Sequence, residues 1–227
     1  MSKSYVLNII PTPIGNLEDI TFRSLDTLKK SDYILCEDTR VSKKLLSKYN
    51  IDVPLVSFHS YNEHKTVQKH IDQILDGKTI SLISDAGTPS ISDPGFLIVR
   101  ESIINDIEIN CLPGPTALIP AIVNSGLSSD RFIFEGFIPN KKGRTKRLKS
   151  LVDEERSIII YESPKKILRL LNNLISFLGE KRKASISREL SKIYQENIRG
   201  TLKELYDKFE NKNIKGELVI VIDGNKN

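Results

Sequence analysis

The chain turns sharply at Ser84-Asp-Ala-Gly-Thr-Pro-Ser-Ile-Ser-Asp-Pro-Gly95, directly after the apolar, strand-like run 79–83. Two similar loops follow strand-like runs elsewhere, at Pro11-Thr-Pro-Ile-Gly-Asn16 and at Leu112-Pro-Gly-Pro-Thr116. Glycine lets the backbone approach a ligand closely, proline stiffens a turn, and open α/β sheets bind ligands in loops that follow their strands. Each loop alone is equally well explained as an ordinary tight turn, but the three together predict a small-molecule site.

Around these loops, short apolar runs alternate with amphipathic stretches. In the first half, strands and helices are expected in alternation at 5–10, 21–31, 33–36, 41–49, 55–58, 66–75, 79–83, 95–105 and 107–112. This alternation predicts a largely parallel sheet that is covered by helices.

The second half contains more strand-like runs in succession, which favours a mixed sheet. Strands are expected at 131–137, 157–161, 184–187, 197–201 and 217–223, and helices at 145–152, 164–178 and 202–211. The region 113–126 mixes Pro and Gly with a short apolar helix and is the expected hinge. We therefore expect two α/β lobes, residues 1–115 and 116–227, with a ligand cleft between them.

Several protein classes are disfavoured by what the sequence lacks. It contains neither GxGxxG nor GxxxxGK[ST], which argues against a Rossmann dinucleotide site, a Rossmann-type methyltransferase site and a P-loop. It has no apolar run of about 18 residues, which argues against a membrane-spanning helix. Because the N-terminal residues pass directly from polar residues into a strand-like run, we expect no signal peptide and a cytoplasmic location.

Cysteine and histidine usage predicts no metal site. His59, His64 and His70 do not share one helical face, and no cysteine or paired carboxylate completes a ligand set. Cys36 and Cys111 are far apart, lie outside any CxxC pattern and each follow a strand-like residue. Both are interpreted as small buried side chains.

The charge is unevenly distributed. The net charge is +5 with a pI near 9.0, and the segment 140–149 carries six basic residues and no acid. This segment is either a contact surface for nucleic acid or the solvated start of a basic helix. For the first alternative the candidate phosphate ligands include Lys141, Lys142, Arg144 and Arg147, and replacing both arginines by Glu is expected to weaken RNA binding without changing the binding of a small ligand.

Nine short motifs, in order and spacing, resemble those of one known family. They are Pro11-Thr-Pro-Ile-Gly-Asn-Leu-Glu-Asp-Ile20, Glu37-Asp-Thr-Arg40, Ser84-Asp-Ala-Gly-Thr-Pro89 with Asp93-Pro-Gly95, Pro113-Gly-Pro115, Ser125-Gly-Leu127, Phe134-Glu-Gly-Phe137, Tyr161-Glu-Ser-Pro164, Arg188-Glu-Leu-Ser-Lys192 and Gly216-Glu-Leu218. The family is that of the 16S rRNA cytidine 2′-O-methyltransferases, a branch of the tetrapyrrole (corrin/porphyrin) methylase superfamily. The resemblance covers essentially the whole chain.

This resemblance implies a tetrapyrrole-methylase-like fold, S-adenosylmethionine as methyl donor, and the ribose of a cytidine in the decoding region of small-subunit rRNA as acceptor. It also implies a folded ribosomal particle as the substrate and a homodimer as the active form. The positions that match the donor contacts of the family are Pro13, Ile14, Gly15, Asp85, Ala86, Gly87, Thr88, Pro115, Thr116, Tyr161, Leu190 and Leu218.

Two positions depart from the family pattern. Lys165-Lys166 stands where the family usually has His-Arg, which keeps the positive charge but loses a proton carrier and the fork of arginine. Gln195 stands where a glutamate is expected, with Glu196 beside it, which argues against a catalytic acid at that position.

Transfer of a methyl group to a ribose hydroxyl is helped when a base removes the hydroxyl proton, by roughly 10²–10⁴-fold. His59 and Glu37 are candidate bases, although a hydrogen-bonded place in the site wall is slightly favoured for His59. Arg40 either binds a phosphate or pairs with Glu37. Glu189 and Lys192 are expected to form an ion pair whose role is either catalytic or structural.

Two other functions stay open at this point. One is a methylase of the same fold that acts on a tetrapyrrole or on a protein side chain. The other is a non-catalytic RNA-binding or ribosome-assembly factor, which does not need to bind the methyl donor.

Overall fold

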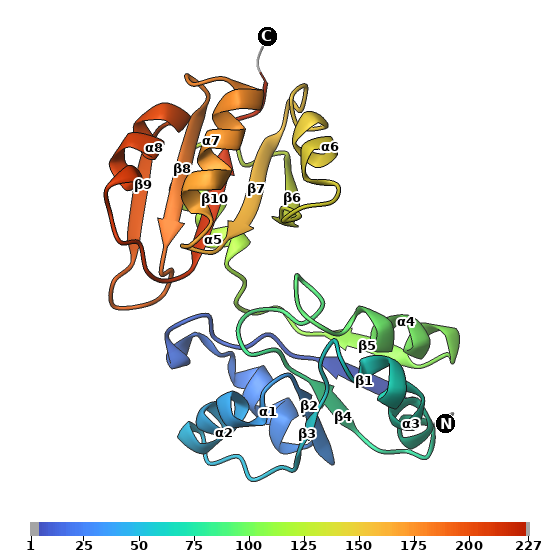
Figure 1. Ribbon diagram of the computed structural model, residues 1–227. Coiled ribbons are helices and arrows are strands. Elements are labelled where there is room, and N and C mark those ends of the chain that lie inside the picture. Colours follow the sequence, from blue (N-terminus) through green and yellow to red (C-terminus); the bar gives the residue numbers. More distant parts are fainter. Residues whose placement is uncertain (1–4, 226–227) are drawn as a thin grey trace. The chain divides into compact units, whose positions relative to one another are not determined.

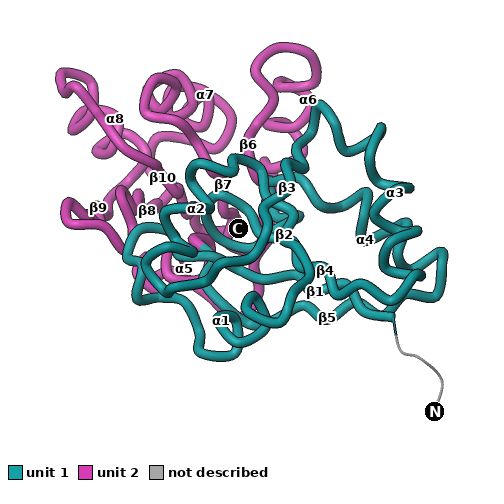
Figure 2. The backbone as a smooth tube through the Cα atoms, turned by 90° about the horizontal axis from the view of Figure 1, so that it is seen from below, with its two compact units in different colours: residues 1–116 teal, residues 117–227 magenta. Residues whose placement is uncertain are grey.

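The structure is a computed structural model that describes residues 5–225. The chain forms two compact units, residues 1–116 and 117–227, which Figure 2 shows in different colours. The division proposed from the sequence, between residues 115 and 116, lies one residue from this boundary. The cleft expected between the lobes stays a prediction, and each unit is described by itself.

The first unit is built on a five-stranded sheet in which every pairing is parallel (Figure 1). The strand order is β3-β2-β4-β1-β5, and the strands are β1 (Val6–Ile9), β2 (Tyr33–Cys36), β3 (Leu55–Ser57), β4 (Ile80–Leu82) and β5 (Glu108–Cys111). Parallel neighbours need crossover connections, which the helices supply. They are η1 (Leu17–Asp19), α1 (Phe22–Lys29), α2 (Thr39–Lys48), α3 (Glu63–Leu75) and α4 (Phe96–Ile104).

Two apolar clusters stabilise this sheet. One contains residues of α3 and α4, such as Ile71 and Ile98, together with Leu7 and Leu82 of the strands. The other contains residues of α1 and α2, such as Leu28. Because strands buried on both sides read as continuous apolar runs, the expected largely parallel, helix-covered sheet was visible in the sequence and is confirmed.

Cys111 corrects one expectation. Cys36 is buried in β2, but Cys111 is exposed. It ends β5, which is the outermost strand of the sheet. An edge strand has a neighbour on one side only, so residues near its end are less covered than those of a central strand.

The second unit is built on a mixed sheet, as expected. The strand order is β6-β7-β10-β8-β9, in which only β6 and β7 pair in parallel. The strands are β6 (Phe132–Phe137), β7 (Ser157–Glu162), β8 (Lys183–Arg188), β9 (Glu196–Thr201) and β10 (Leu218–Ile222). The helices are α5 (Leu118–Ser125), α6 (Arg144–Lys149), α7 (Ile167–Leu178) and α8 (Leu202–Glu210).

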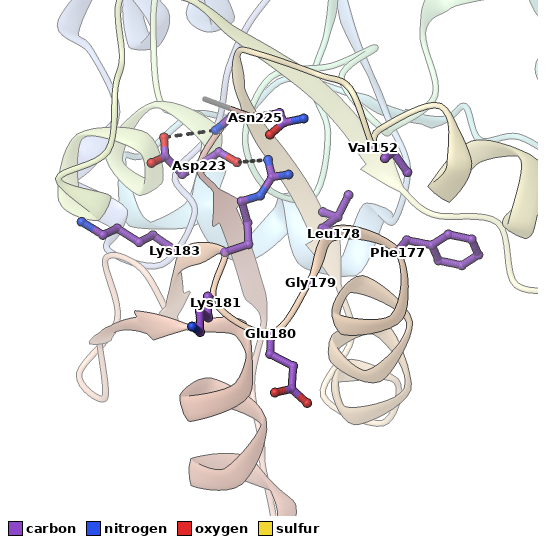
Figure 3. A pocket seen from close by; sticks show the side chains of 11 residues that line it. Val152, Phe177, Leu178, Gly179, Glu180, Lys181, Lys183, Asp223 and Asn225 are labelled. Atoms are coloured by element: carbon purple, nitrogen blue, oxygen red, sulfur yellow. Dashed lines mark hydrogen bonds between the residues drawn. The ribbon is translucent and has the colours of Figure 1, made fainter. Parts of the chain in front are cut away.

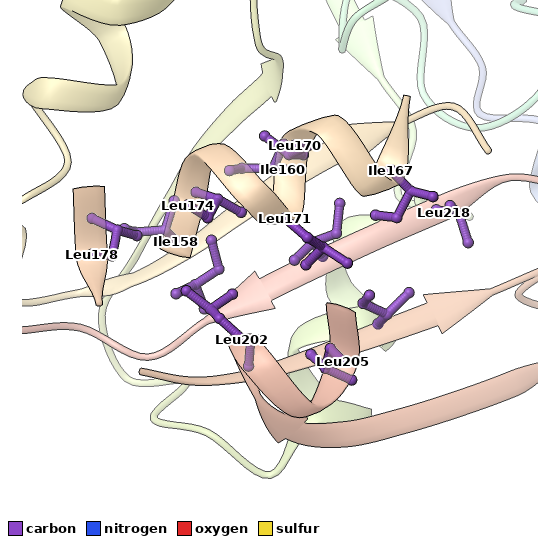
Figure 4. Packing of buried hydrophobic residues seen from close by; sticks show 14 of the residues in the cluster. Ile158, Ile160, Ile167, Leu170, Leu171, Leu174, Leu178, Leu202, Leu205 and Leu218 are labelled. Atoms are coloured by element: carbon purple, nitrogen blue, oxygen red, sulfur yellow. The ribbon is translucent and has the colours of Figure 1, made fainter. Parts of the chain in front are cut away.

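The core of this unit lies under α7 and α8 (Figure 4). The buried residues of α7 recur at helical spacing, which places them on one face: Ile167, Leu170, Leu171, Leu174 and Leu178. They join Ile158 and Ile160 of β7 in one apolar cluster. Each such side chain contributes about 1.5–3 kcal/mol when fully buried, so the apolar face of α7 is what fixes this helix to the sheet.

Candidate active site

The three turn-rich loops of the first unit lie at the carboxyl ends of neighbouring strands. β1 is flanked by β4 and β5, so the loops that follow these strands, 11–16, 84–95 and 112–116, come together at one edge of the sheet. Main-chain hydrogen bonds join the first loop to the second: Thr12 N–H donates to Gly87 O at 2.8 Å, and Gly87 N–H donates to Thr12 O at 2.9 Å. The hydroxyl of Thr88 then donates to Pro115 O at 3.1 Å and joins the second loop to the third.

Glycines allow these loops to approach one another. Gly114 has no side chain, and a Cβ there would lie 2.8 Å from Cβ of Pro11. Gly87 has φ of +84°, and a Cβ there would contact Ile14 Cγ2 at 3.6 Å. Only glycine adopts such a φ without strain, so the loops are held together by backbone geometry. The donor-contact positions expected from the resemblance in this unit lie on these three loops.

Acidic side chains surround the end of β2. Glu37 and Asp38 follow β2 directly, and Asp38 N–H donates to Asp85 Oδ1 at 3.1 Å. Burial raises the pKa of Glu37, the nearby Asp85 and Asp38 carboxylates raise it further, and His59 opposes them. Burial and Asp38 raise the pKa of Asp85 as well, against the hydrogen bond from the Asp38 amide. Three carboxyl groups in one place favour a ligand that carries positive charge or several hydroxyl groups.

Arg40 pairs with Asp38, which is neither the phosphate nor the Glu37 carboxylate that were the two alternatives from the sequence. Its guanidinium forms a fork on the carboxylate, with Nε to Oδ1 at 3.0 Å and Nη2 to Oδ2 at 2.6 Å. These hydrogen bonds lower the pKa of Asp38 to about 2. The reason for this choice of partner is that Asp38 is the N-cap of α2 and already accepts a bond from Arg40 N–H at 2.8 Å. The side chain of Arg40 is otherwise exposed.

His59 is half-buried and already holds two hydrogen bonds. Its amide donates to Asn62 Oδ1 at 2.8 Å, and its Nδ1 accepts from Tyr61 N–H at 3.3 Å. When Nδ1 accepts, the proton of the neutral ring is on Nε2, so the ring has no free acceptor nitrogen in this arrangement. The geometry favours the alternative in which His59 is a hydrogen-bonded residue of the site wall.

The site residues expected in the second unit lie at or near one end of the central strands of its sheet. Tyr161 lies on β7 beside Val219 of β10, and Leu218 lies beside Arg188 of β8. The ring of Tyr161 is packed edge-on against Phe134 and Phe137. Leu190 and Leu218 are buried, and Leu218 belongs to the apolar core. The side chain of Leu218 therefore packs in the core, whereas its backbone lies at the start of β10.

The expected ion pair between Glu189 and Lys192 is present and is half-buried. Lys192 Nζ donates to Glu189 Oε1 at 2.9 Å and also to Glu217 Oε2 at 2.8 Å. Burial raises the pKa of Glu189, but Lys192 and the Glu217 amide lower it by more, so the pKa lies below its usual range. Burial lowers the pKa of Lys192, but the two carboxylates raise it by more. Both groups stay charged near neutral pH, which favours the structural alternative.

The side chain of Gln195 bonds to the backbone of the loop 189–195. Its Oε1 accepts from Ser191 N–H at 2.7 Å, whereas the adjacent Glu196 pairs with Arg188. Glu189 and Ser191 both have positive φ, 51° and 65°, so the loop needs such bonds to keep its shape. The glutamine at the departing position thus holds the backbone.

The structure divides the basic segment 140–149. Lys141 and Lys142 are exposed, and Arg147 pairs with Glu135. Arg144 corrects the expectation, because it is only 6% exposed. Its Nε donates to Asn173 Oδ1 at 2.9 Å and its Nη1 to Pro139 O at 3.2 Å. Its guanidinium therefore lies inside the unit and cannot contact an RNA phosphate in this arrangement.

The sequence reasoning missed three residues that shape the site. Thr12 Oγ1 donates to Ser84 O at 2.9 Å, and Ser84 Oγ donates to Gly87 O at 3.1 Å. The N–H of Asp38 holds Asp85 in place. Each belongs to a quoted motif, but only the tertiary structure shows which groups they meet.

One cavity lies apart from these residues. This cavity of about 900 Å³ opens at the other end of the second sheet, and Lys181, Lys183 and Asp223 line it (Figure 3). None of the expected site residues lines this cavity. Within residues 5–225, no group of three or more His, Cys, Asp or Glu side chains is placed to hold a metal ion.

Comparisons with known proteins extend over almost the whole chain. The family model of the tetrapyrrole (corrin/porphyrin) methylases matches residues 6–206. The chain is 44% identical over 218 residues to ribosomal RNA small subunit methyltransferase I of Thermotoga maritima, covering 96% of this chain and 98% of that protein. It is 42% identical over 223 residues to the protein of the same name from Bacillus subtilis, covering 98% and 76%.

Solved structures share the fold at low identity. The cobalt precorrin-4 methyltransferase CbiF matches with a TM-score of 0.70 at 18% identity, covering 96% of this chain and 95% of that one. A diphthine synthase matches with a TM-score of 0.73 at 12% identity, covering 96% and 90%. The expected tetrapyrrole-methylase-like α/β fold is therefore confirmed.

Proposed function

Because the chain belongs to the tetrapyrrole (corrin/porphyrin) methylase family, and within it to the ribosomal RNA small subunit methyltransferase I family, we propose that it methylates a cytidine of small-subunit rRNA. The methyl donor is S-adenosylmethionine, and the acceptor is the ribose 2′-oxygen of a cytidine in the decoding region. The observation that carries this proposal is the 44% identity, which extends over 96% of this chain and 98% of the Thermotoga relative.

The first-unit loops fit the chemistry of the donor, which carries a positively charged sulfonium, an ammonium group and ribose hydroxyls. Glu37, Asp38 and Asp85 supply negative charge beside loops whose backbone is tightly joined. Residues proposed to contact the donor here are Pro13, Ile14, Gly15, Asp85, Ala86, Gly87, Thr88, Pro115 and Thr116. In the second unit we propose Tyr161, Leu190 and the backbone of Leu218.

The donor supplies a methyl group that is already activated for displacement. The protein must then hold the ribose oxygen in line, exclude water and accept a proton from the hydroxyl. Among the candidate bases, Glu37 is best suited, because its raised pKa makes it a stronger base than an ordinary carboxylate. His59 tunes Glu37 by its position, and Glu189 with Lys192 maintains the loop that carries Leu190.

Exposed cations are proposed to hold the rRNA backbone. They are Arg40 of the first unit and Lys141, Lys142 and Arg147 of the second. Phosphate contacts of this kind position the RNA without reading its bases, and they make binding depend strongly on salt. The assembled small subunit as substrate, a homodimer and a cytoplasmic location are inferred from the resemblance. Among the helices within residues 5–225, none is long and apolar enough to span a bilayer.

The test is transfer of a tritiated methyl group to small ribosomal subunits that lack the modification, followed by mapping of the labelled nucleotide. Label on the ribose of one cytidine is the expected result. Label on ribosomal protein alone, or on an added tetrapyrrole, would reject the rRNA substrate in favour of another methylase activity. Absence of donor binding in calorimetry would instead support a non-catalytic assembly factor. The variant Asp85→Asn should lose donor affinity, whereas Asp153→Asn, an exposed acid after α6, should retain it.

A further inference from the structure

Two acid-free stretches of the second unit lie side by side. Residues 139–152 contain six basic side chains and residues 163–179 contain three, and neither stretch contains Asp or Glu. The first stretch holds α6 and the second holds α7, and these two helices pack against each other. Packing therefore joins two clusters of positive charge that the sequence separates.

Two guanidinium groups fasten the loop before α6 to α7. Arg144 of α6 donates to Asn173 of α7 and to Pro139 O, at 2.9 Å and 3.2 Å. Arg169 of α7 donates in the opposite direction, from Nη2 to Asn140 O at 3.1 Å. The backbone that carries Lys141 and Lys142 is thereby held at a defined place beside the start of α7.

This arrangement is electrostatically unfavourable for the protein alone. Arg144 Nη2 is buried and has no hydrogen-bond partner within the described residues. Burial lowers the pKa of Arg144, and Arg169 lowers it further, with Glu162 as the opposing carboxylate. Glu162 is itself buried and accepts from Ser163 N–H at 2.8 Å. Neighbouring cations repel one another, and a polyanion that binds beside them relieves this repulsion.

The start of α7 adds to the same imbalance. Lys165 and Lys166 precede the helix, and Arg169 lies in its first turn, where the helix dipole is positive. The first turn has no acidic residue, and the N-cap Lys166 makes no side-chain capping bond. Acidic side chains are the ones that stabilise the N-terminal turn of a helix. Cations at this position do not stabilise α7, which indicates a functional role for them.

We propose that Lys141, Lys142, Lys165, Lys166 and Arg169 form one surface, the phosphate surface, which binds the backbone of the RNA substrate. All five side chains are exposed. Arg144 is a positioning residue beneath this surface and does not contact RNA. The inference rests on the proposed function and deepens it, because three of the five cations lie outside the basic segment that the sequence indicates.

The opposite edge of the same unit provides a contrast. Lys181 and Lys183 line the cavity of Figure 3, but Glu180 and Asp223 line it too. Arg182 Nη1 donates to Asp223 O at 3.2 Å. Charge of both signs is present there, so that edge lacks the excess that would attract a polyanion.

The experiment compares two charge-reversed double variants of the full chain. Lys165→Glu with Lys166→Glu alters the phosphate surface, and Lys181→Glu with Lys183→Glu is the matched control. Binding to unmodified small ribosomal subunits is measured over a salt series, and donor binding is measured by calorimetry. For the first variant we expect affinity to fall about tenfold or more and the slope of log K against log salt to fall by about 2. The control should stay within about twofold, and both should bind the donor normally.

The outcomes separate this inference from the proposed function. If the wild-type chain neither binds nor methylates the subunit, both are rejected. If the wild type methylates it but the two double variants bind it equally, only the phosphate surface is rejected.

A second pair of variants tests the role of Arg144 through its partner. Asn173→Leu removes the acceptor of Arg144, whereas Asn173→Asp keeps an acceptor and adds negative charge. If Arg144 positions the loop, Asn173→Leu should weaken subunit binding by about fivefold, because a displaced loop weakens several phosphate contacts at once. Asn173→Asp should change binding by less than about twofold. A greater loss for Asn173→Asp would show that net charge alone matters and would overturn the positioning role.

Discussion

Arg144 is held by uncharged acceptors inside the second unit. Its partners are the side-chain amide of Asn173 and the carbonyl of Pro139. A planar guanidinium with five donors suits such a place better than a lysine, because it makes directed bonds in several directions. Its neighbour Arg147 lies on the surface and pairs with Glu135.

Arg144→Glu should destabilise the second unit by about 3–5 kcal/mol, because it places an unpaired carboxylate where the charge is desolvated and Glu162 is near. Urea unfolding measures this change. Lys142→Glu on the same segment is exposed and should change stability by less than about 0.5 kcal/mol. Equal stability of the two variants would contradict the burial of Arg144. The double replacement of Arg144 and Arg147 is consequently a poor probe of RNA binding.

Glu37 makes stability depend on pH. Its pKa is raised, so the folded chain holds the proton more tightly than the unfolded chain does, and ionisation above the raised pKa costs folding free energy. Glu37→Gln should therefore raise the melting temperature at pH 7, and this gain should vanish as the pH falls to about 4, where wild-type Glu37 is protonated. Thermal scans over this range, with methyl transfer measured alongside, check the prediction. A gain that persists at pH 4 would point to packing instead of charge.

Residue-level surprises have a common physical origin. Arginine is rarely buried, so a basic segment is rightly expected to face solvent unless a distant acceptor exists. Asn173 lies 29 positions from Arg144, and nothing local in the sequence connects them. Arg40 was expected to choose between phosphate and Glu37, but the N-cap geometry of Asp38 brings that carboxylate closer. Side-chain partners depend on caps and packing that periodicity does not encode.

At the scale of elements, the loops of the first unit depend on one close approach. Gly114→Ala places a Cβ 2.8 Å from Pro11 Cβ, so the first and third loops must separate. Donor affinity, measured by calorimetry, should fall by about tenfold or more, since misplacement by about 1 Å has effects of this order.

Gly200→Ala is the matched control for this change. Its new Cβ meets Glu204 Oε2, the movable end of a side chain, at 2.9 Å. Donor affinity should then stay within about twofold of the wild type, because a carboxylate end shifts at little cost. Equal losses for both variants would mean that the junction of the loops does not govern donor binding.

Element types were well predicted and element neighbours were not. Continuous apolar runs identified β1, β2 and β4, and helical spacing identified α7. The expected helix 145–152 is shorter in the structure, where α6 ends at Lys149. The next residues form turns, in which Leu151 N–H donates to Leu148 O and Val152 N–H donates to Lys149 O. The strand order β3-β2-β4-β1-β5 brings Asp38 to Asp85, and no local sequence pattern specifies this order.

At the scale of the whole molecule, each unit has its own apolar core. The clusters around Leu7 and Ile10 contain only residues of the first unit, and the cluster around Leu171 contains only residues of the second. The change from alternating strands and helices in the first half to successive strands in the second half predicted two lobes. What it did not indicate was the joining of two basic stretches in the second unit, since that depends on the contact of α6 with α7.

Leu171→Ala should therefore lower stability in the second unit only. Leu171 is fully buried, and its truncation costs about 2–5 kcal/mol. In native-state hydrogen exchange, amides of β7, β8 and β10 should lose protection while those of β1, β2 and β4 keep theirs. Ile71→Ala, also fully buried, should show the reverse pattern. Loss of protection in both units from either change would show a single cooperative structure.

The pair of main-chain bonds between Thr12 and Gly87 also bears on how freely this chain can be altered. Both bonds join backbone atoms, so substitutions at neighbouring positions other than Thr12 and Gly87 leave their donors and acceptors in place. Laboratory evolution can therefore diversify Ile14, Ala86 and Thr116 in one library without dismantling the scaffold that carries them. A search for variants that accept donors with larger alkyl groups has its natural starting point there.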